Sequence, residues 1–240
     1  MKTIMKTTGV ILIVFLTLSM CKKPCDRFNL ETDDIYHRDG YSFSYNELHE
    51  QPNWVFYKIT PSDITCHDNK AKRKNNFKPD TDVLTGSATL SDYSGSGYDR
   101  GHLKSSADES CDQEQMDETF LMSNMSPQVP SFNRGIWKKL ESYVRDIAEE
   151  SDSVYVYTAG ELTMELEYIG ENHVSIPNYY YKVIYVFKNG QQTNFAYYLK
   201  NEKSKLPLET FLITVEDVEN KVLIDFPDTI SKGIYPKMIK

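Results

Sequence analysis

The sequence has few cysteines, and none of them forms a CxxC pair. The four cysteines are Cys21, Cys25, Cys66 and Cys111, so a zinc site built from cysteine pairs is not expected. No internal repeat is visible, and strand-like and helix-like segments do not alternate regularly, which argues against a doubly wound parallel sheet. What remains is a mixed fold without repeats.

The chain also lacks an excess of basic residues. Its 27 Lys and Arg stand against 35 Asp and Glu, which gives a formal charge of −8. This argues against a polycation that coats nucleic acid, because such binding comes mainly from displaced counterions. It does not exclude an enzyme with a local positive cleft. With 240 residues, 40% hydrophobic and 26% charged, the chain is typical of one folded globular domain.

The N-terminus contains the only long apolar run of the sequence. Lys2 and Lys6 precede about a dozen apolar residues, and no acidic residue comes before Cys21. The run is too short to cross a hydrocarbon layer of about 30 Å, but it has the length of a signal-peptide core. Residues 1–20 are therefore predicted to be a signal peptide, and their removal leaves 25 basic and 35 acidic residues, a formal charge of −10.

The segment Leu18-Ser-Met-Cys21 resembles the lipobox of bacterial lipoproteins, although a smaller residue than Met20 is usual there. The resemblance implies that Cys21 is lipidated after cleavage. We expect residues 21–39 to form a lipid-attached linker and residues 40–240 to form the domain. The protein would then be anchored through its lipid in the bacterial cell envelope, at the outer membrane or cell surface, and otherwise it would be periplasmic or secreted.

Outside the cytoplasm thiols tend to be oxidised. If Cys21 carries lipid, three cysteines remain for at most one internal disulfide. Cys25 lies in the expected linker, so Cys66 with Cys111 is the favoured pair.

Hydrophobic periodicity predicts a mixed α/β (α+β) domain with a largely antiparallel central sheet and flanking helices. Asn189-Gly190 between two strand-like segments is typical of a type I′ hairpin. The basic cluster at residues 70–74 is interpreted as a solvated loop more readily than as a surface facing a polyanion. The expected strands are 54–60, 88–93, 154–157, 179–187 and 193–199, and the expected helices are 133–150 and 208–218.

Three motifs follow one another in the middle of the chain: Tyr98-Asp-Arg-Gly-His-Leu103, Glu118-Thr-Phe-Leu-Met-Ser-Asn-Met-Ser-Pro-Gln128 and Phe132-Asn-Arg-Gly-Ile-Trp-Lys-Lys-Leu-Glu141. In order and spacing they resemble the DNA/RNA non-specific endonucleases, the ββα-metal nucleases that include endonuclease G. Weaker similarity runs from about residue 41 to residue 227. The resemblance implies the ββα-metal nuclease fold.

The resemblance also implies a catalytic set. His102 would be the general base, a role that suits an imidazole because it titrates near neutrality. Asn133 would be the single direct ligand of a Mg²⁺ ion, which keeps most of its waters and which Mn²⁺ can replace. Without the motif, His102 would be read as a structural or surface histidine and Asn133 as a helix cap.

Glu141 matches the glutamate that acts on the metal through water. In one regular helix it would lie about 12 Å along the axis from Asn133 and roughly 80° around it, so direct ligation by both is not expected. The alternative is a surface pair with Arg145. Arg100 and Arg145 match two arginines that face the scissile phosphate, and Asn124 matches a further asparagine of the site, with a turn-forming role as its alternative.

The implied function is Mg²⁺-dependent hydrolysis of DNA and RNA to products with 5′ phosphates, and relatives are often homodimers. An arginine that some relatives contribute from an earlier segment has no counterpart near Asn53-Trp54. One alternative is a lipid-anchored protein that binds nucleic acid or a host partner without cleaving. Another is a toxin-type nuclease, for which the chain supplies no delivery module.

Overall fold

The structure is a computed structural model that describes residues 35–68, 70–230 and 235–239. The predicted signal peptide, the predicted lipidation site Cys21, Cys25 and most of the predicted linker lie outside these ranges. Within them, no helix has both the length and the apolar character that a membrane crossing requires.

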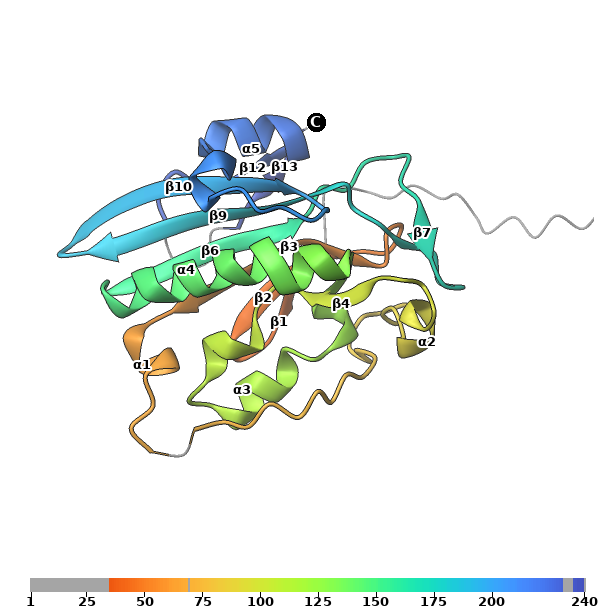
Figure 1. Cartoon of the computed structure of the whole chain (residues 1–240), viewed down its shortest axis with the longest axis horizontal. Coiled ribbons are helices and arrows are strands. Elements are labelled where there is room, and N and C mark those ends of the chain that lie inside the picture. The colour runs from red at the N-terminus through yellow and green to blue at the C-terminus, as the bar shows by residue number, and fades with distance from the viewer. Residues whose placement is uncertain (1–34, 69, 231–234, 240) are drawn as a thin grey trace, which may run out of the picture. The chain divides into compact units, whose positions relative to one another are not determined.

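A seven-stranded sheet organises the domain, and every neighbouring pair of its strands is antiparallel (Figure 1). The prediction of a largely antiparallel sheet is therefore correct. In spatial order the strands are β1 (Ile35–His37), β2 (Tyr41–Asn46), β3 (Gln51–Ile59), β6 (Ser153–Gly160), β9 (Tyr179–Lys188), β10 (Gln191–Lys200) and β11 (Leu212–Ile213).

The central strands are apolar on both sides, and their alternation divides the core in two. On β9, Tyr180 and Ile184 belong to one buried cluster, whereas Tyr181 and Val183 belong to the other. This period of two is the geometry of a strand covered on both faces. The β9–β10 turn has positive φ at both Asn189 (54°) and Gly190 (73°), as the type I′ prediction requires.

One helix covers each face of the sheet. The helix α4 (Lys138–Glu149) packs Leu140 and Val144 into the first cluster, and α5 (Val215–Val222) packs Val218 and Val222 into the second. Tyr143 of α4 is 40% exposed.

A small ββα unit lies on the α4 side of the sheet. Its two strands, β4 (Asp99–His102) and β5 (Met125–Gln128), pair antiparallel. A short π-helix, η3 (Phe132–Trp137), connects β5 to α4. The remaining elements are α1 (Pro61–Ile64), α2 (Leu90–Tyr93), η1 (Ser106–Glu109), α3 (Gln113–Glu118), η2 (Met122–Asn124), β7 (Tyr168–Ile169), β8 (Val174–Ser175), η4 (Leu208–Phe211), β12 (Ile224–Asp225) and β13 (Lys237–Met238).

Two predicted elements differ from the structure. Residues 88–93, predicted as a strand, end in the helix α2, because the carboxylate of Asp92 accepts a hydrogen bond from the backbone N–H of Thr89 (2.7 Å) and caps the helix start. The helix predicted at 208–218 is broken into η4, β11 and α5. There Thr214 and Asp217 form a capping box that starts a new helix.

The boundary predicted at residue 40 is also too late. The strand β1 lies inside the segment predicted as linker, where it pairs with β2. In the same segment Arg38 forms an ion pair with the buried carboxylate of Asp80 at 2.6 Å. The domain therefore begins no later than Ile35.

Cys66 and Cys111 form a disulfide with their Cα atoms 5.3 Å apart, as predicted. The bond fastens the loop that follows α1 to the segment before α3.

We expect the double variant Cys66→Ser/Cys111→Ser to lose about 2 to 4 kcal/mol of unfolding free energy, because a closed loop restricts the unfolded chain. Denaturant titration of the oxidised parent and the variant measures this. Added reductant should destabilise the parent and leave the variant unchanged, and equal stability of all four samples would contradict it.

Candidate active site

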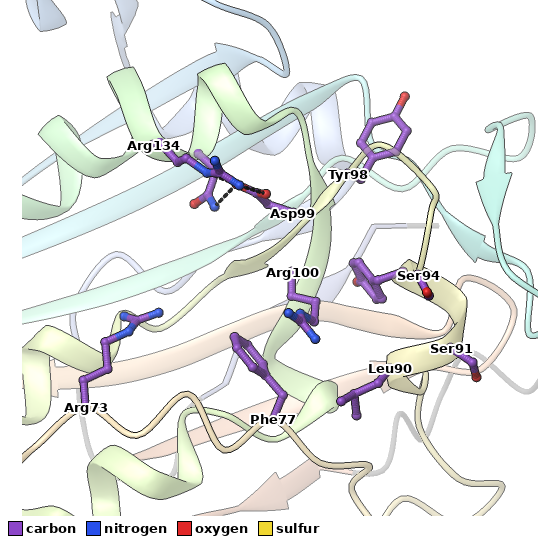
Figure 2. Close-up of a pocket in the computed structure, with 11 residues that line it drawn as sticks. Arg73, Phe77, Leu90, Ser91, Ser94, Tyr98, Asp99, Arg100 and Arg134 are labelled. Carbon is purple, nitrogen blue, oxygen red and sulfur yellow. Dashed lines mark hydrogen bonds and ion pairs between the residues drawn. The ribbon is translucent and has the colours of Figure 1, made fainter.

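A cavity of about 780 Å³ opens beside the ββα unit. Three arginines line it, namely Arg73, Arg100 and Arg134, together with Asn133. Figure 2 shows the side chains of Arg73 and Arg100 around the ring of Phe77, and the Arg100 guanidinium lies 4.2 Å from the centre of that ring. The cavity is therefore a positive recess in a chain of negative net charge.

Asp99 joins the strand of the unit to its helix. Its Oδ2 accepts hydrogen bonds from Asn133 Nδ2 (2.9 Å) and Arg134 Nε (2.8 Å), and its Oδ1 pairs with Arg134 Nη2 at 2.6 Å. Between Asp99 and His102 the motif requires glycine at position 101. A Cβ there would lie 2.2 Å from the side chain of Gln128 on the paired strand. The Asp-Arg-Gly-His motif thus fixes both the pairing of β4 with β5 and the position of the helix η3.

Asn133 precedes an interruption of the helix. Gly135 has φ −108° and ψ −109°, outside the helical region, so Asn133 and Glu141 do not lie on one regular helix. The calculation for a continuous helix does not apply to this pair.

A divalent metal fits the donor that Asn133 offers. Because Asn133 Nδ2 donates to Asp99, the carbonyl oxygen on the other arm of the amide is turned away from that carboxylate and remains a hard, neutral ligand at the cavity wall. One such oxygen suits an ion that keeps most of its water, as Mg²⁺ does. The described residues contain no group of three or more His, Cys, Asp or Glu side chains placed to hold a metal.

His102 lies beside the cavity and is largely enclosed, with 8% of its surface exposed. Its ring packs edge-on against Phe77 and Phe120, at centroid distances of 5.6 and 4.8 Å. Its Nε2 has no hydrogen-bond partner among the described residues. Burial, aided by the charges of Arg73 and Arg100, lowers the pKa of His102 to about 3, so the ring is neutral at neutral pH.

Arg73 is a cavity residue that the sequence interpretation missed. Its Nη1 donates to Ser106 Oγ (2.7 Å), and its guanidinium stacks 5.0 Å from the centre of the Phe120 ring. The sequence favours a solvated loop for the basic cluster at residues 70–74 over a surface facing a polyanion. Near Asn53-Trp54, where no matching arginine is present, both side chains are buried in β3. The signal that could have found it is the disulfide, which returns the loop of Arg73 to the segment after β4.

Arg145 was predicted to face the phosphate, but the structure directs it elsewhere. Its Nη1 pairs with Asp108 Oδ1 at 2.8 Å and its Nη2 donates to Ser142 Oγ, and it does not line the cavity. The reason is that Asp108 is only 3% exposed and a buried carboxylate requires a counter-charge.

Glu141 also lies outside the cavity lining. Burial raises the pKa of Glu141, and the positive charges of Lys182, Arg145 and Arg73 act in the opposite direction. Within the described residues Glu141 makes no ion pair with Arg145 at 4.0 Å or less, so the alternative of a simple surface pair is not supported. The Glu141 carboxylate is therefore subject to the charges of Lys182, Asp108 and Arg145, and also to the charge of the cavity residue Arg73.

Lys182, at the centre of β9, is a second residue that the sequence did not single out. Its Nζ donates to Leu103 O and to the hydroxyl of Tyr57, both at 3.1 Å, and it lies 4.7 Å from the centre of the Trp137 ring. Trp137 Nε1 in turn donates to His102 O (3.3 Å). Two interior side chains therefore hold the backbone at and just after His102.

Asn124 has a positional role. It is fully buried; its Oδ1 accepts from Lys104 N (3.0 Å), and its Nδ2 donates to Lys104 O (3.0 Å) and Thr119 O (2.8 Å). Both amide hydrogens are used and the side chain is buried outside the cavity lining, so in this structure Asn124 positions the backbone. It fixes the chain two residues after His102.

The cavity thus brings together two of the predicted residues, Arg100 and Asn133, with His102 adjacent on the same face of β4 as Arg100. Glu141, Arg145 and Asn124 are not among the residues that line it. This arrangement combines a neutral proton acceptor, guanidinium groups for an anion and an amide oxygen for a hydrated cation.

The chain is similar in sequence to known nucleases. Residues 26–232 match the family model of the DNA/RNA non-specific endonucleases. The chain is 34% identical to nuclease C1 of Cunninghamella echinulata var. echinulata over 82% of this chain and 84% of that protein. It is 32% identical to human mitochondrial endonuclease G over 76% of this chain and 65% of that protein.

A solved structure is similar as well. A chain in the crystal structure of an EndoG/EndoGI complex aligns with a TM-score of 0.75 and 32% identity, covering 79% of this chain and 84% of that chain. The fold is accordingly that of a ββα-metal nuclease. The chain belongs to the DNA/RNA non-specific endonuclease family, whose members are metal-dependent nucleases, and is a hydrolytic endonuclease.

Proposed function

We propose that this chain is a Mg²⁺-dependent endonuclease that hydrolyses both DNA and RNA, with His102 as general base, and leaves 5′ phosphates. The observation that carries the proposal is the state of His102. A buried ring nitrogen without a partner is costly in a folded protein, and here it is found beside a cavity lined by arginines. Such an arrangement is typical of a functional group rather than of a packing histidine.

In the proposed reaction the neutral imidazole accepts a proton from the attacking water, which approaches phosphorus opposite the departing 3′ oxygen. Arg73 and Arg100 bind the phosphate oxygens, and their charges are directed at the negative charge that develops there. Substrate binding also offsets the two charges that depress the pKa of His102. The base would therefore become stronger when the substrate is in place.

Asn133 would hold the magnesium ion, and Glu141 would act on it through water. When bound, the ion supplies positive charge that stabilises the transition state and the leaving oxygen. Asp99 orients the amide by accepting from Asn133 Nδ2. The groups assigned to the reaction meet phosphate, water and metal, so little preference for sequence or for the 2′ position is expected.

The direct test incubates the purified protein with supercoiled plasmid and with single-stranded RNA in Mg²⁺. Both should be degraded, and the fragments should accept label from polynucleotide kinase only after phosphatase treatment, because their 5′ ends are already phosphorylated. Binding without cleavage of either polymer would instead favour the lipid-anchored binding protein. Fragments that accept label directly would refute the proposed product chemistry.

Arg73 provides a test of the cavity itself. We expect Arg73→Ala to lower kcat/KM for plasmid cleavage about 100- to 1,000-fold, the usual effect of removing one donor to the developing charge. Lys74→Ala is the matched control, since Lys74 is 53% exposed and pairs with Asp117, and it should stay within about twofold of the parent. Equal losses in the two variants would mean that general electrostatics, not contact with phosphate, explain the effect.

We also propose, from the sequence alone, that Cys21 is lipidated and anchors the enzyme in the cell envelope, with a periplasmic or secreted form as the alternative. Cys21→Ser should then move the protein from the membrane fraction to the soluble fraction. A homodimer is expected from the family resemblance only, and its test is the mass in solution.

A further inference from the structure

The connection after β10 is fastened to the backbone that leads into the catalytic helix. Asn201 Oδ1 accepts from Val129 N (2.9 Å), while Asn201 Nδ2 donates to Pro127 O (3.1 Å) and Pro177 O (3.0 Å). Val129 O accepts in turn from Asn133 N (2.9 Å). Residues 200–206 are therefore held in a defined place beside the start of η3.

Two recesses flank this connection. One, of about 300 Å³, is lined by Ile136 of η3 and by Lys200, Lys203 and Lys205. The other, of about 320 Å³, is lined by Lys200 and by Tyr98, which also lines the catalytic cavity. The second recess also carries the carboxylates of Glu165 and Glu167. The first recess lies next to the catalytic cavity along η3, because Asn133 lines the cavity and Ile136 lines the recess.

The charge of the first recess is positive, since three lysines line it with one carboxylate, Glu202. Lys200 pairs with Glu202 at 2.9 Å. Lys203 and Lys205 are exposed, and in the described part of the chain neither makes an ion pair within 4.0 Å. Lys203 and Lys205 therefore give this recess a local positive charge on a protein of formal charge −8, and such a recess attracts a polyanion.

We propose that residues 200–206 form a secondary nucleic-acid-binding site, in which Lys203 and Lys205 bind backbone phosphates beyond the scissile phosphodiester. This inference rests on the proposed function and adds that the preferred substrate is a polymer long enough to reach from the catalytic cavity to the connection. Phosphate contacts of this kind add affinity without reading sequence, which agrees with a non-specific nuclease.

The test uses the double variant K203Q/K205Q and a 24-base-pair duplex, with a thymidine dinucleotide as the short substrate. Binding is measured by fluorescence anisotropy in Ca²⁺ across a salt series. Loss of two phosphate contacts should weaken duplex binding on the order of tenfold near 0.1 M salt and reduce the slope of log K against log salt by up to about 2. The ratio of duplex to dinucleotide hydrolysis should fall by a similar factor in Mg²⁺.

K188Q/K237Q is the control with the same charge change. Lys188 lies at the opposite end of the β9–β10 hairpin from Lys200, and Lys237 lies on β13, on the face covered by α5. A loss equal to that of K203Q/K205Q would mean that net charge alone matters and would overturn the site. Unchanged duplex affinity and slope in K203Q/K205Q would also overturn it, even if the parent cleaves normally.

Failure of the proposed function is a separate result, namely a parent that cleaves neither substrate, and the binding arm still tests the connection in that case. Vesicles with anionic lipid distinguish a membrane partner. If K203Q/K205Q loses vesicle binding and keeps duplex binding, the nucleic-acid site is wrong.

Discussion

Replacing His102 with alanine is expected to lower kcat for plasmid and RNA cleavage by about 100- to 10,000-fold, the usual contribution of a positioned general base. The ring makes no hydrogen bond through Nε2 that the fold would miss, so the loss should be one of chemistry. Initial rates in Mg²⁺ measure it, with circular dichroism and denaturant titration to check the fold. His37→Ala is the control, since that ring lies at the edge of the sheet, where it hydrogen-bonds to Ser42. A rate for His102→Ala within a few-fold of the parent would exclude this base.

The same residue gives the protein a predictable response to acid. The pKa of His102 falls from 6.5 to about 3 on folding, so between these values the unfolded chain binds more protons than the folded one. The free energy of unfolding should therefore fall as the pH falls from about 6.5 toward 3. The contribution of this one group is about 1.4 kcal/mol for each pH unit. Denaturant titrations of parent and His102→Ala at several pH values measure the difference, and parallel profiles would contradict the assignment.

Removing the divalent cation is expected to abolish cleavage, and Asn133→Ala is expected to lower kcat about 100- to 1,000-fold at the parent's optimal Mg²⁺ concentration. Losing the one amide ligand should also raise the Mg²⁺ concentration for half-maximal activity, so part of the rate should return at high Mg²⁺. A metal titration of the rate separates the two effects. Ser131→Ala, two residues earlier and without a capping hydrogen bond, should titrate like the parent. An unchanged metal dependence in Asn133→Ala would place the ion elsewhere.

The sheet could be predicted because its evidence is local. The strands β9 and β10 carry apolar residues with turn residues between them, and Asn189-Gly190 is sufficient to predict the hairpin. The helix α2 could not be predicted as easily, because four residues leave no periodicity and only the Thr89–Asp92 cap marks it. Local pattern therefore accounts for most of the sheet and for little of the short connections.

The site residues, like the elements of the fold, include some that local sequence predicts and some that it does not. Arg100, His102 and Asn133 stand in motifs whose order along the chain implies their proximity. Arg73 reaches the cavity through a disulfide and a loop without regular structure, and Lys182 is a lysine in a strand whose burial depends on partners 79 to 125 residues away. Such residues become visible only when the tertiary contacts are known.

Among the described residues, nine of the eleven side chains that line the catalytic cavity lie between Cys66 and Cys111, and the other two, Asn133 and Arg134, follow the second cysteine. Most of the cavity wall is therefore carried on a single covalently closed ring of chain. A copy of the protein held in a reducing compartment would keep the metal-binding amide but lose the covalent tie between the two ends of the remaining wall. The covalent closure of the cavity wall is in this way linked to the oxidation state of a single pair of cysteines.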